Sequence, residues 1–282
     1  MVLHQVAVVS ESENVPFSEL GRVSAALQKQ AIRDLAPVWE VQATVDAFSV
    51  LEDVPIGYWP IIIMDDIGED AAGVHEDKDG QPFALVQADA GWALTASHEC
   101  LEMLVDPFGK NLIPGPSKME GQGRVEFLVE VCDPSEDASF GYTVNGITVS
   151  DFYTPQYFDP VASPSVRYSF TGAIKEPRQV LRGGYLSWHD PVTDHWFQEI
   201  FFSGSRSRFR DLGVLTATAG ENFRTLIYRV TPESFRARRP TTRRLASLTA
   251  AMETVSESTY SKAEAWRQQI AQLTGRELRR PE

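Results

Sequence analysis

The stretch TASHECLEMLVDP, residues 95–107, makes up most of a predicted helix that runs from Trp92 to the stop signal DPFG. Residues four positions apart share one face of a helix, so His98 and Glu102 can point at the same ion, and Glu99 lies about 100° further round. The pattern is the helical zinc signature H-E-x-x-H with its second histidine replaced by Glu102. In that signature the two outer residues hold the metal, and the glutamate accepts a proton from a metal-bound water.

The neighbours of this motif are apolar or small, which indicates a buried helix. Buried charges require partners or a metal, so three ionisable side chains on such a helix favour a functional site. The alternative interpretation is a solvated acidic face beside a core histidine.

Hydrophobic patterns upstream predict a strand, a helix, three further strands and then the motif helix. Residues 73–80, GVHEDKDG, have turn chemistry and are predicted as a loop, and Pro82 favours an edge position for the strand after it. The predicted strands cover residues 5–10, 38–50, 59–66 and 82–89, and the first helix lies within 15–39.

Downstream, residues 125–134 fit a strand or a helix equally well, and residues 141–202 are β-rich. An Asn-Gly pair at 145–146 predicts a hairpin. Residues 203–213 are predicted as a basic loop, and a long amphipathic helix is predicted at 241–274. The expected organisation is an N-terminal unit at 1–135, a β-rich segment at 136–202, and a basic linker with the C-terminal helix at 203–282.

Charge is distributed unevenly over the chain. Residues 201–282 carry 15 Lys/Arg and 8 Asp/Glu, a net charge of +7, which leaves 11 and 31 (26 − 15 and 39 − 8), or −20, for the rest. An acidic body makes nucleic acid an unlikely ligand and suits a divalent cation or a basic partner. With no signal peptide, no membrane-spanning run and two cysteines, we expect a cytoplasmic protein, although leaderless export stays open.

The element order together with SHECLEMLVDP, EVCD (130–133) and GVHEDKDGQPFALV (73–86) resembles the N-terminal subdomain of zincin metallopeptidases, of the gluzincin type, over about residues 1–135. The resemblance implies an α+β fold with a mixed sheet, an edge strand, a backing helix and an active-site helix. It also implies that the edge strand binds the substrate backbone, which places a peptide along residues 83–88.

The resemblance implies His98 and Glu102 as metal ligands and Glu99 as general base. It implies a third ligand from downstream, for which Glu130 is the best match, with Asp133 and Asp106 as alternatives. Tyr185 is implied as a hydroxyl donor to the oxyanion, or else it is a packed aromatic.

The ligand set implies Zn²⁺, but the carboxylate at Glu102 also admits manganese, iron or calcium. His75 is expected at the surface, with an approach to the site as the alternative. His189 and His195 flank a turn and are either turn residues or a small surface metal site, while Cys100 is expected in the core.

The leading hypothesis is metal-dependent hydrolysis of a peptide bond. The competing hypothesis is a non-catalytic zincin-fold scaffold that docks on a protein partner through its basic C-terminal helix. A third is a calcium-stabilised domain held by carboxylates alone.

Overall fold

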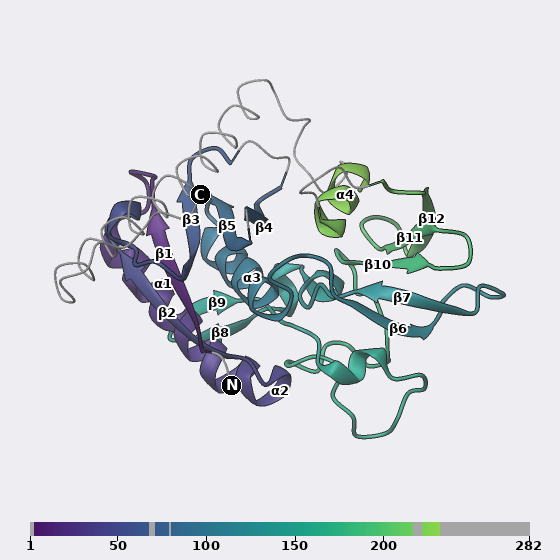
Figure 1. Cartoon of the computed structure of the whole chain (residues 1–282). Coiled ribbons are helices and arrows are strands. Elements are labelled where there is room, and N and C mark those ends of the chain that lie inside the picture. Colours follow the sequence, from purple (N-terminus) through teal and green to yellow (C-terminus); the bar gives the residue numbers. More distant parts are fainter. Residues whose placement is uncertain (1–2, 68–70, 79, 217–221, 232–282) are drawn as a thin grey trace, which may run out of the picture.

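Two five-stranded sheets flank the helix α3 (Trp92–Val105) in the computed structural model of the chain (Figure 1). The structure describes residues 3–67, 71–78, 80–216 and 222–231. The protein is therefore of the mixed α+β class, as predicted, and α3 has the bounds that the sequence indicates.

The first sheet has the strand order β2-β1-β3-β5-β4. Its first four strands are parallel, and β4 runs antiparallel to β5 at the edge. Continuous apolar runs such as Ile61–Ile63 are typical of strands that are buried on both faces. The strands are β1 (Leu3–Ser10), β2 (Gln42–Phe48), β3 (Tyr58–Met64), β4 (Gly73–Lys78) and β5 (Gln81–Gln87).

Both faces of this sheet are covered. Val6 and Val8 point to the larger core, which they share with Leu27 of α1 (Phe17–Gln30) and Leu101 of α3. Helix α1 continues through a π-helical turn, Ala31–Leu35, into the short α2 (Ala36–Trp39). The alternate residues of the strands, with Leu51 and Ile67, form a second, smaller core on the other face. This arrangement holds α3 firmly against one face of the sheet.

The second sheet is wholly antiparallel, with the order β12-β11-β10-β7-β6. It takes strands from all three of the segments that the sequence suggests. The strands are β6 (Leu112–Pro116), β7 (Arg124–Leu128), β10 (Tyr185–Asp190), β11 (His195–Ile200) and β12 (Arg208–Gly213).

The predicted Asn-Gly hairpin is confirmed. Strands β8 (Tyr142–Val144) and β9 (Ile147–Val149) pair antiparallel around Asn145 and Gly146, whose φ angles are 52° and 79°. Both residues adopt the left-handed backbone that a two-residue hairpin turn requires. Val144 and Val149 pack on Ala26 of α1, so the hairpin is anchored to that helix.

Two predictions near the motif helix are wrong. Residues 73–78 are the strand β4 rather than a loop, and β5 is an interior strand between β3 and β4 rather than the edge. Pro82 is compatible with this position because pairing of β5 with β3 begins only at Ala84, so the missing N–H of the proline costs no bond to β3. The edge of the sheet next to α3 is therefore β4.

The expected loop at 203–213 is also partly wrong, because Arg208–Gly213 form the strand β12, which pairs with β11. A short helix follows, α4 (Phe223–Val230), whose N-terminus is capped by the Asn222 side chain. The predicted helix at 241–274 lies outside the described residues. Among the helices that the structure does describe, none combines the length and the apolar character needed to cross a membrane.

Candidate functional site

Helix α3 places the three motif residues in the interior. His98 is 8% exposed, Glu99 2% and Glu102 0%. As the spacing predicts, His98 and Glu102 share one face, and His98 Nε2 lies 3.4 Å from Glu102 Oε2. The helix is therefore a buried element with ionisable side chains, not a solvated acidic face.

The second part of the site comes from the segment after β7. Residues 125–134 are neither a full strand nor a helix: β7 ends at Leu128, and a 3-10 turn begins at Asp133. The irregular backbone between them brings both Glu130 and Asp133 to α3, whereas Glu126 stays on the strand and contacts His189. His98 Nε2 lies 3.3 Å from Asp133 Oδ1, and Glu102 Oε1 accepts a hydrogen bond of 3.1 Å from the Cys132 N–H.

This turn approaches the backbone at Gly184, directly before β10. A Cβ atom at that position would lie 2.4 Å from the carbonyl oxygen of Asp133 and 2.7 Å from the carbonyl carbon of Pro134. Only glycine permits this backbone contact. The turn at Asp133 is therefore packed tightly against the backbone that leads into β10.

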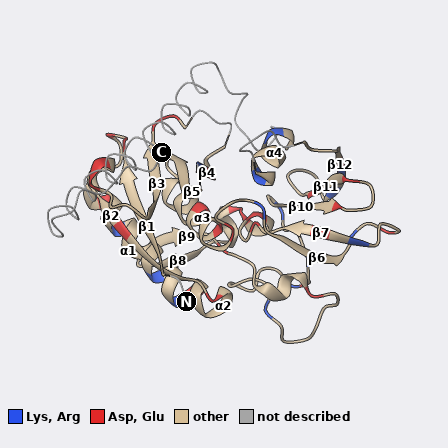
Figure 2. Ribbon diagram, viewed as in Figure 1, with Lys and Arg blue, Asp and Glu red and all other residues tan. Residues whose placement is uncertain are grey.

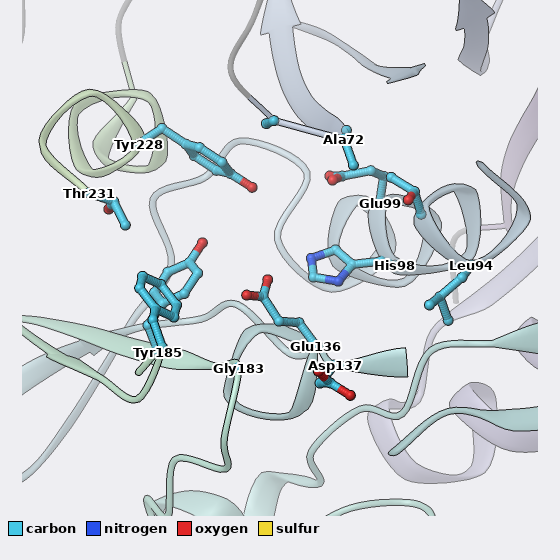
Figure 3. Close-up of a pocket in the computed structure, with 14 residues that line it drawn as sticks. Ala72, Leu94, His98, Glu99, Glu136, Asp137, Gly183, Tyr185, Tyr228 and Thr231 are labelled. Atoms are coloured by element: carbon cyan, nitrogen blue, oxygen red, sulfur yellow. The ribbon is translucent and has the colours of Figure 1, made fainter. Parts of the chain in front are cut away.

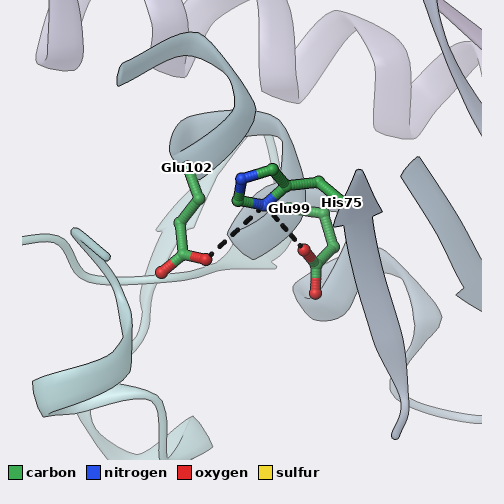
Figure 4. A group of neighbouring side chains, drawn as sticks. All are labelled: His75, Glu99 and Glu102. Atoms are coloured by element: carbon green, nitrogen blue, oxygen red, sulfur yellow. Dashed lines mark hydrogen bonds and ion pairs between the residues drawn. The ribbon is translucent and has the colours of Figure 1, made fainter. Parts of the chain in front are cut away.

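The expectation that His75 lies at the surface is wrong. This residue lies on β4 and is 0% exposed. Its Nδ1 is 3.3 Å from Glu99 Oε2 and 3.8 Å from Glu102 Oε2. Figure 4 shows these three side chains and both contacts. The Nε2 atom of His75 is 3.1 Å from the carbonyl oxygen of Asp106. The edge strand thus orients the glutamate that the motif assigns as a base.

Arg224, on α4, is the residue of this cluster that sequence reasoning misses. It is 1% exposed, and its guanidinium contacts three carboxylates: Glu99 at 3.1 Å, Glu130 at 2.7 Å, and Glu102. In Figure 2, basic positions of α4 lie near the acidic positions of α3. The segment NFRTLIYRV carries no motif that would single out Arg224, so only tertiary structure reveals its partners.

These contacts set the electrostatics of the cluster. Burial alone would raise the pKa of Glu102, but Arg224 and His98 outweigh burial and hold that pKa well below its usual value. Burial raises the pKa of Glu130 and of Asp133. For His98, burial opposes the charged ring, but the nearby Glu102 and Asp133 prevail and the pKa is raised.

A cavity of about 280 Å³ opens beside this cluster. His98 and Glu99 line it from α3, and the hydroxyls of Tyr185 and Tyr228 project into it from the opposite side (Figure 3). Glu136, which sequence reasoning also misses, directs its carboxylate toward His98, whereas Asp137 points away. The predicted oxyanion donor Tyr185 is therefore in the same cavity as the predicted base.

The remaining candidates lie apart from the cavity. Asp106 accepts a hydrogen bond of 2.9 Å from the Asn111 N–H and so stabilises the turn after α3. His189 contacts Glu126 and Asp194, and His195 contacts Asp211, in partly exposed pairs on the second sheet. Cys100 is buried in the core as predicted, and burial raises the pKa of its thiol to about 12, which makes it unreactive.

The cluster offers donor sets that fit a divalent cation. Within the described residues, three groups each bring ligand atoms within 4.8 Å of one another: His75, Glu99 and Glu102; His98, Asp133 and Glu136; and Glu102, Glu130 and Asp133. An imidazole with carboxylates suits zinc, manganese or iron. In two of the three groups, however, the Arg224 guanidinium already contacts the glutamates.

Comparison with known proteins gives no match, whether to a family model, a curated protein or a solved structure. The function must therefore be argued from the site itself.

Proposed function

We propose that this chain is a metal-dependent hydrolase that cleaves a peptide bond in the cavity between α3, the turn at Asp133 and α4. The observation that carries the proposal is that His98, Glu99, Glu136 and Tyr185, from three separate segments, line one cavity, with Asp133 directly behind His98 at 3.3 Å. A divalent ion bound there, zinc or a harder metal, would polarise a carbonyl group and lower the pKa of a water molecule toward 7.

Glu99 is the proposed general base. Its carboxylate lines the cavity and is held by His75 at 3.3 Å and by Arg224 at 3.1 Å. Two such contacts fix its direction, which is what proton transfer at a defined atom needs. Tyr185 is the proposed donor to the oxyanion, since its hydroxyl faces the same cavity (Figure 3).

The proposed substrate is an extended peptide along the sheet edge next to the cavity. Residues 83–88 cannot take that role as an edge, because β5 pairs on both sides. In the described part of the chain β4 pairs only with β5, and Gly73 at its start lines the cavity. Addition of a strand to β4 would deliver the peptide backbone to the cavity mouth.

A second candidate is a non-catalytic scaffold with the same fold. Arg224 favours it, because this internal cation already contacts Glu99, Glu102 and Glu130 without any metal. The C-terminal segment would then dock on a protein partner, as the basic composition of residues 201–282 suggests.

One comparison separates the two candidates. The full chain, loaded with Zn²⁺ or Mn²⁺, is incubated with a pool of unstructured peptides, and the products are followed by mass spectrometry. If the chain is a hydrolase, the wild type should cleave peptides. The E99Q variant should not cleave them, although its metal content should equal that of the wild type. The control variant E120Q, changed at an exposed position, should cleave normally. A wild type without metal and without cleavage would support the scaffold and overturn the hydrolase.

A further inference from the structure

Three ligand groups cannot all serve one ion, so the choice among them determines how the site works. The group of His98, Asp133 and Glu136 is the one that faces the cavity: His98 and Glu136 line it, and Glu136 points toward the His98 ring (Figure 3). The other two groups are composed entirely of buried side chains.

The inner groups already have a cation from the protein, Arg224. Glu102 Oε2 accepts a hydrogen bond from the Arg224 guanidinium, and Glu102 Oε1 accepts one from the Cys132 N–H. Both oxygens of this carboxylate therefore have donors. Glu130 Oε2 lies 2.7 Å from the same guanidinium. A second cation placed among these carboxylates would be repelled by Arg224 at short range in a medium of low dielectric constant. Entry of a metal there would require α4 to leave.

Asp133 has no such contact with Arg224. It is 1% exposed, and among the residues that the structure describes neither of its carboxylate oxygens has a hydrogen-bond partner of good geometry and its one ion-pair contact is with His98 Nε2, at 3.3 Å. Burial of a carboxylate without donors is costly unless a cation or hydrogen bonds compensate it. His98 is thus the single direct charged partner of Asp133 in the described part of the chain, and the contact is made by the imidazole nitrogen that would be a metal ligand.

We propose that a divalent transition-metal ion binds on the cavity wall through His98 Nε2 and the carboxylates of Asp133 and Glu136, with Arg224 keeping Glu102 and Glu130 out of the ligand set. This inference rests on the proposed metal-dependent function; it keeps His98 as a ligand but removes Glu102, the second ligand that the motif suggests. One nitrogen and two oxygens leave room for a water or substrate oxygen on the side of the cavity. Glu99 lies on the same wall, next to His98 in the helix.

The test is metal binding by the full chain, with Zn²⁺ and Mn²⁺ titrated by calorimetry after chelation and bound metal counted by elemental analysis. Wild type should bind one ion in the cavity. E136Q and D133N should each weaken that binding at least tenfold. D137N is the matched control, because Asp137 lines the same cavity but points away, and asparagine keeps the oxygen that accepts from the Ser139 N–H; its affinity should stay within twofold.

E130Q tests the rival ligand set and should also leave affinity within about threefold. If E130Q loses the ion while E136Q and D133N retain it, the ligand set proposed here is wrong but metal dependence stands. If wild type binds no ion at all, both the ligand set and the proposed function fail. Circular dichroism and thermal unfolding verify that each variant folds, and E136Q, at the partly exposed position, decides the matter if D133N does not fold.

Discussion

Arg224 Nη2 donates a hydrogen bond of 3.1 Å to Glu99 Oε2, across 125 positions of the sequence. The same guanidinium contacts Glu102 and Glu130, so a single residue of α4 joins the motif helix to the segment after β7. Its side chain also lies over the Tyr228 ring, 4.9 Å from the ring centre. This cation therefore ties α4 both to α3 and to the segment that follows β7 of the second sheet.

Replacement of Arg224 by methionine should destabilise the protein strongly. The change keeps an apolar stem but leaves three buried carboxylates without their cation, and the loss of one partner from a buried ion pair costs about 3–5 kcal/mol. We expect a decrease of that size in the free energy of unfolding at pH 7, measured by urea titration. R229M, an exposed position of the same helix, should change stability by less than about 0.5 kcal/mol. Equal effects of the two variants would show that the buried contacts carry no net stability.

A methyl group at Gly73 should disrupt the junction between β4 and α3. A Cβ atom there would lie 2.5 Å from Thr95 Cγ2 and 2.9 Å from Glu99 Oε1. Overpacking of this kind costs about 1–3 kcal/mol, and G73A should lower the melting temperature accordingly. G21A is the contrasting variant, since nothing lies within 4 Å of a Cβ atom at this α1 position; it should stabilise the helix by about 0.5–1 kcal/mol. A neutral G73A would mean that β4 shifts freely against α3.

The pattern of residues within each element is enough to predict α3 and the β8–β9 hairpin. The residues that determine α3 lie within its own length, and Asn145-Gly146 specifies the turn by its backbone preference alone. The shared face of His98 and Glu102 follows from helical geometry, which needs no tertiary information. These predictions succeed because each depends on short-range physics.

The environment of the site could not be predicted in the same way. GVHEDK contains three charged residues and reads as a turn, but pairing with β5 makes it a strand and buries His75. Arg224 and Glu136 carry no motif, and their positions depend on how the second sheet packs against α3. Sequence spacing specifies one face of one helix, whereas the partners of that face come from segments whose placement is a property of the whole fold.

Asp190 should give stability a dependence on acid pH. Its Oδ1 accepts a hydrogen bond of 3.0 Å from the Val192 N–H, and its Oδ2 accepts one of 2.9 Å from the Thr193 hydroxyl. The bond from Val192, together with the bond from Thr193, lowers the pKa of the carboxyl group. A pKa that is lower in the folded state contributes stability above the unfolded value of about 3.9, and the contribution is lost as pH falls through the folded pKa. D190N should therefore be less stable than wild type by about 1 kcal/mol at pH 5–8, with the difference shrinking below pH 4. Unfolding curves at several pH values measure this, and a gap that stays constant to pH 2 would exclude the ionised carboxylate as its source.

Removal of the Tyr185 hydroxyl should slow hydrolysis without affecting metal binding. Tyr185 is 6% exposed, lines the cavity opposite His98 and Glu99, and packs edge-on against Phe202, so phenylalanine fits the same space. Loss of one oxyanion donor typically reduces kcat about 100-fold, and we expect Y185F to do so while its Zn²⁺ affinity and melting temperature stay near those of wild type. Y168F is the matched control: Tyr168 is also buried and accepts a hydrogen bond from the Ser163 N–H at 2.8 Å, but it lies outside the cavity lining. Initial rates on a cleaved peptide, with calorimetric metal titration of each variant, make the measurement. A Y185F rate within twofold of wild type would assign Tyr185 to packing. An equal loss of rate in Y168F would attribute the effect to stability. The comparison is informative because a hydroxyl that meets the reacting carbonyl changes kcat while it leaves the fold and the bound ion in place.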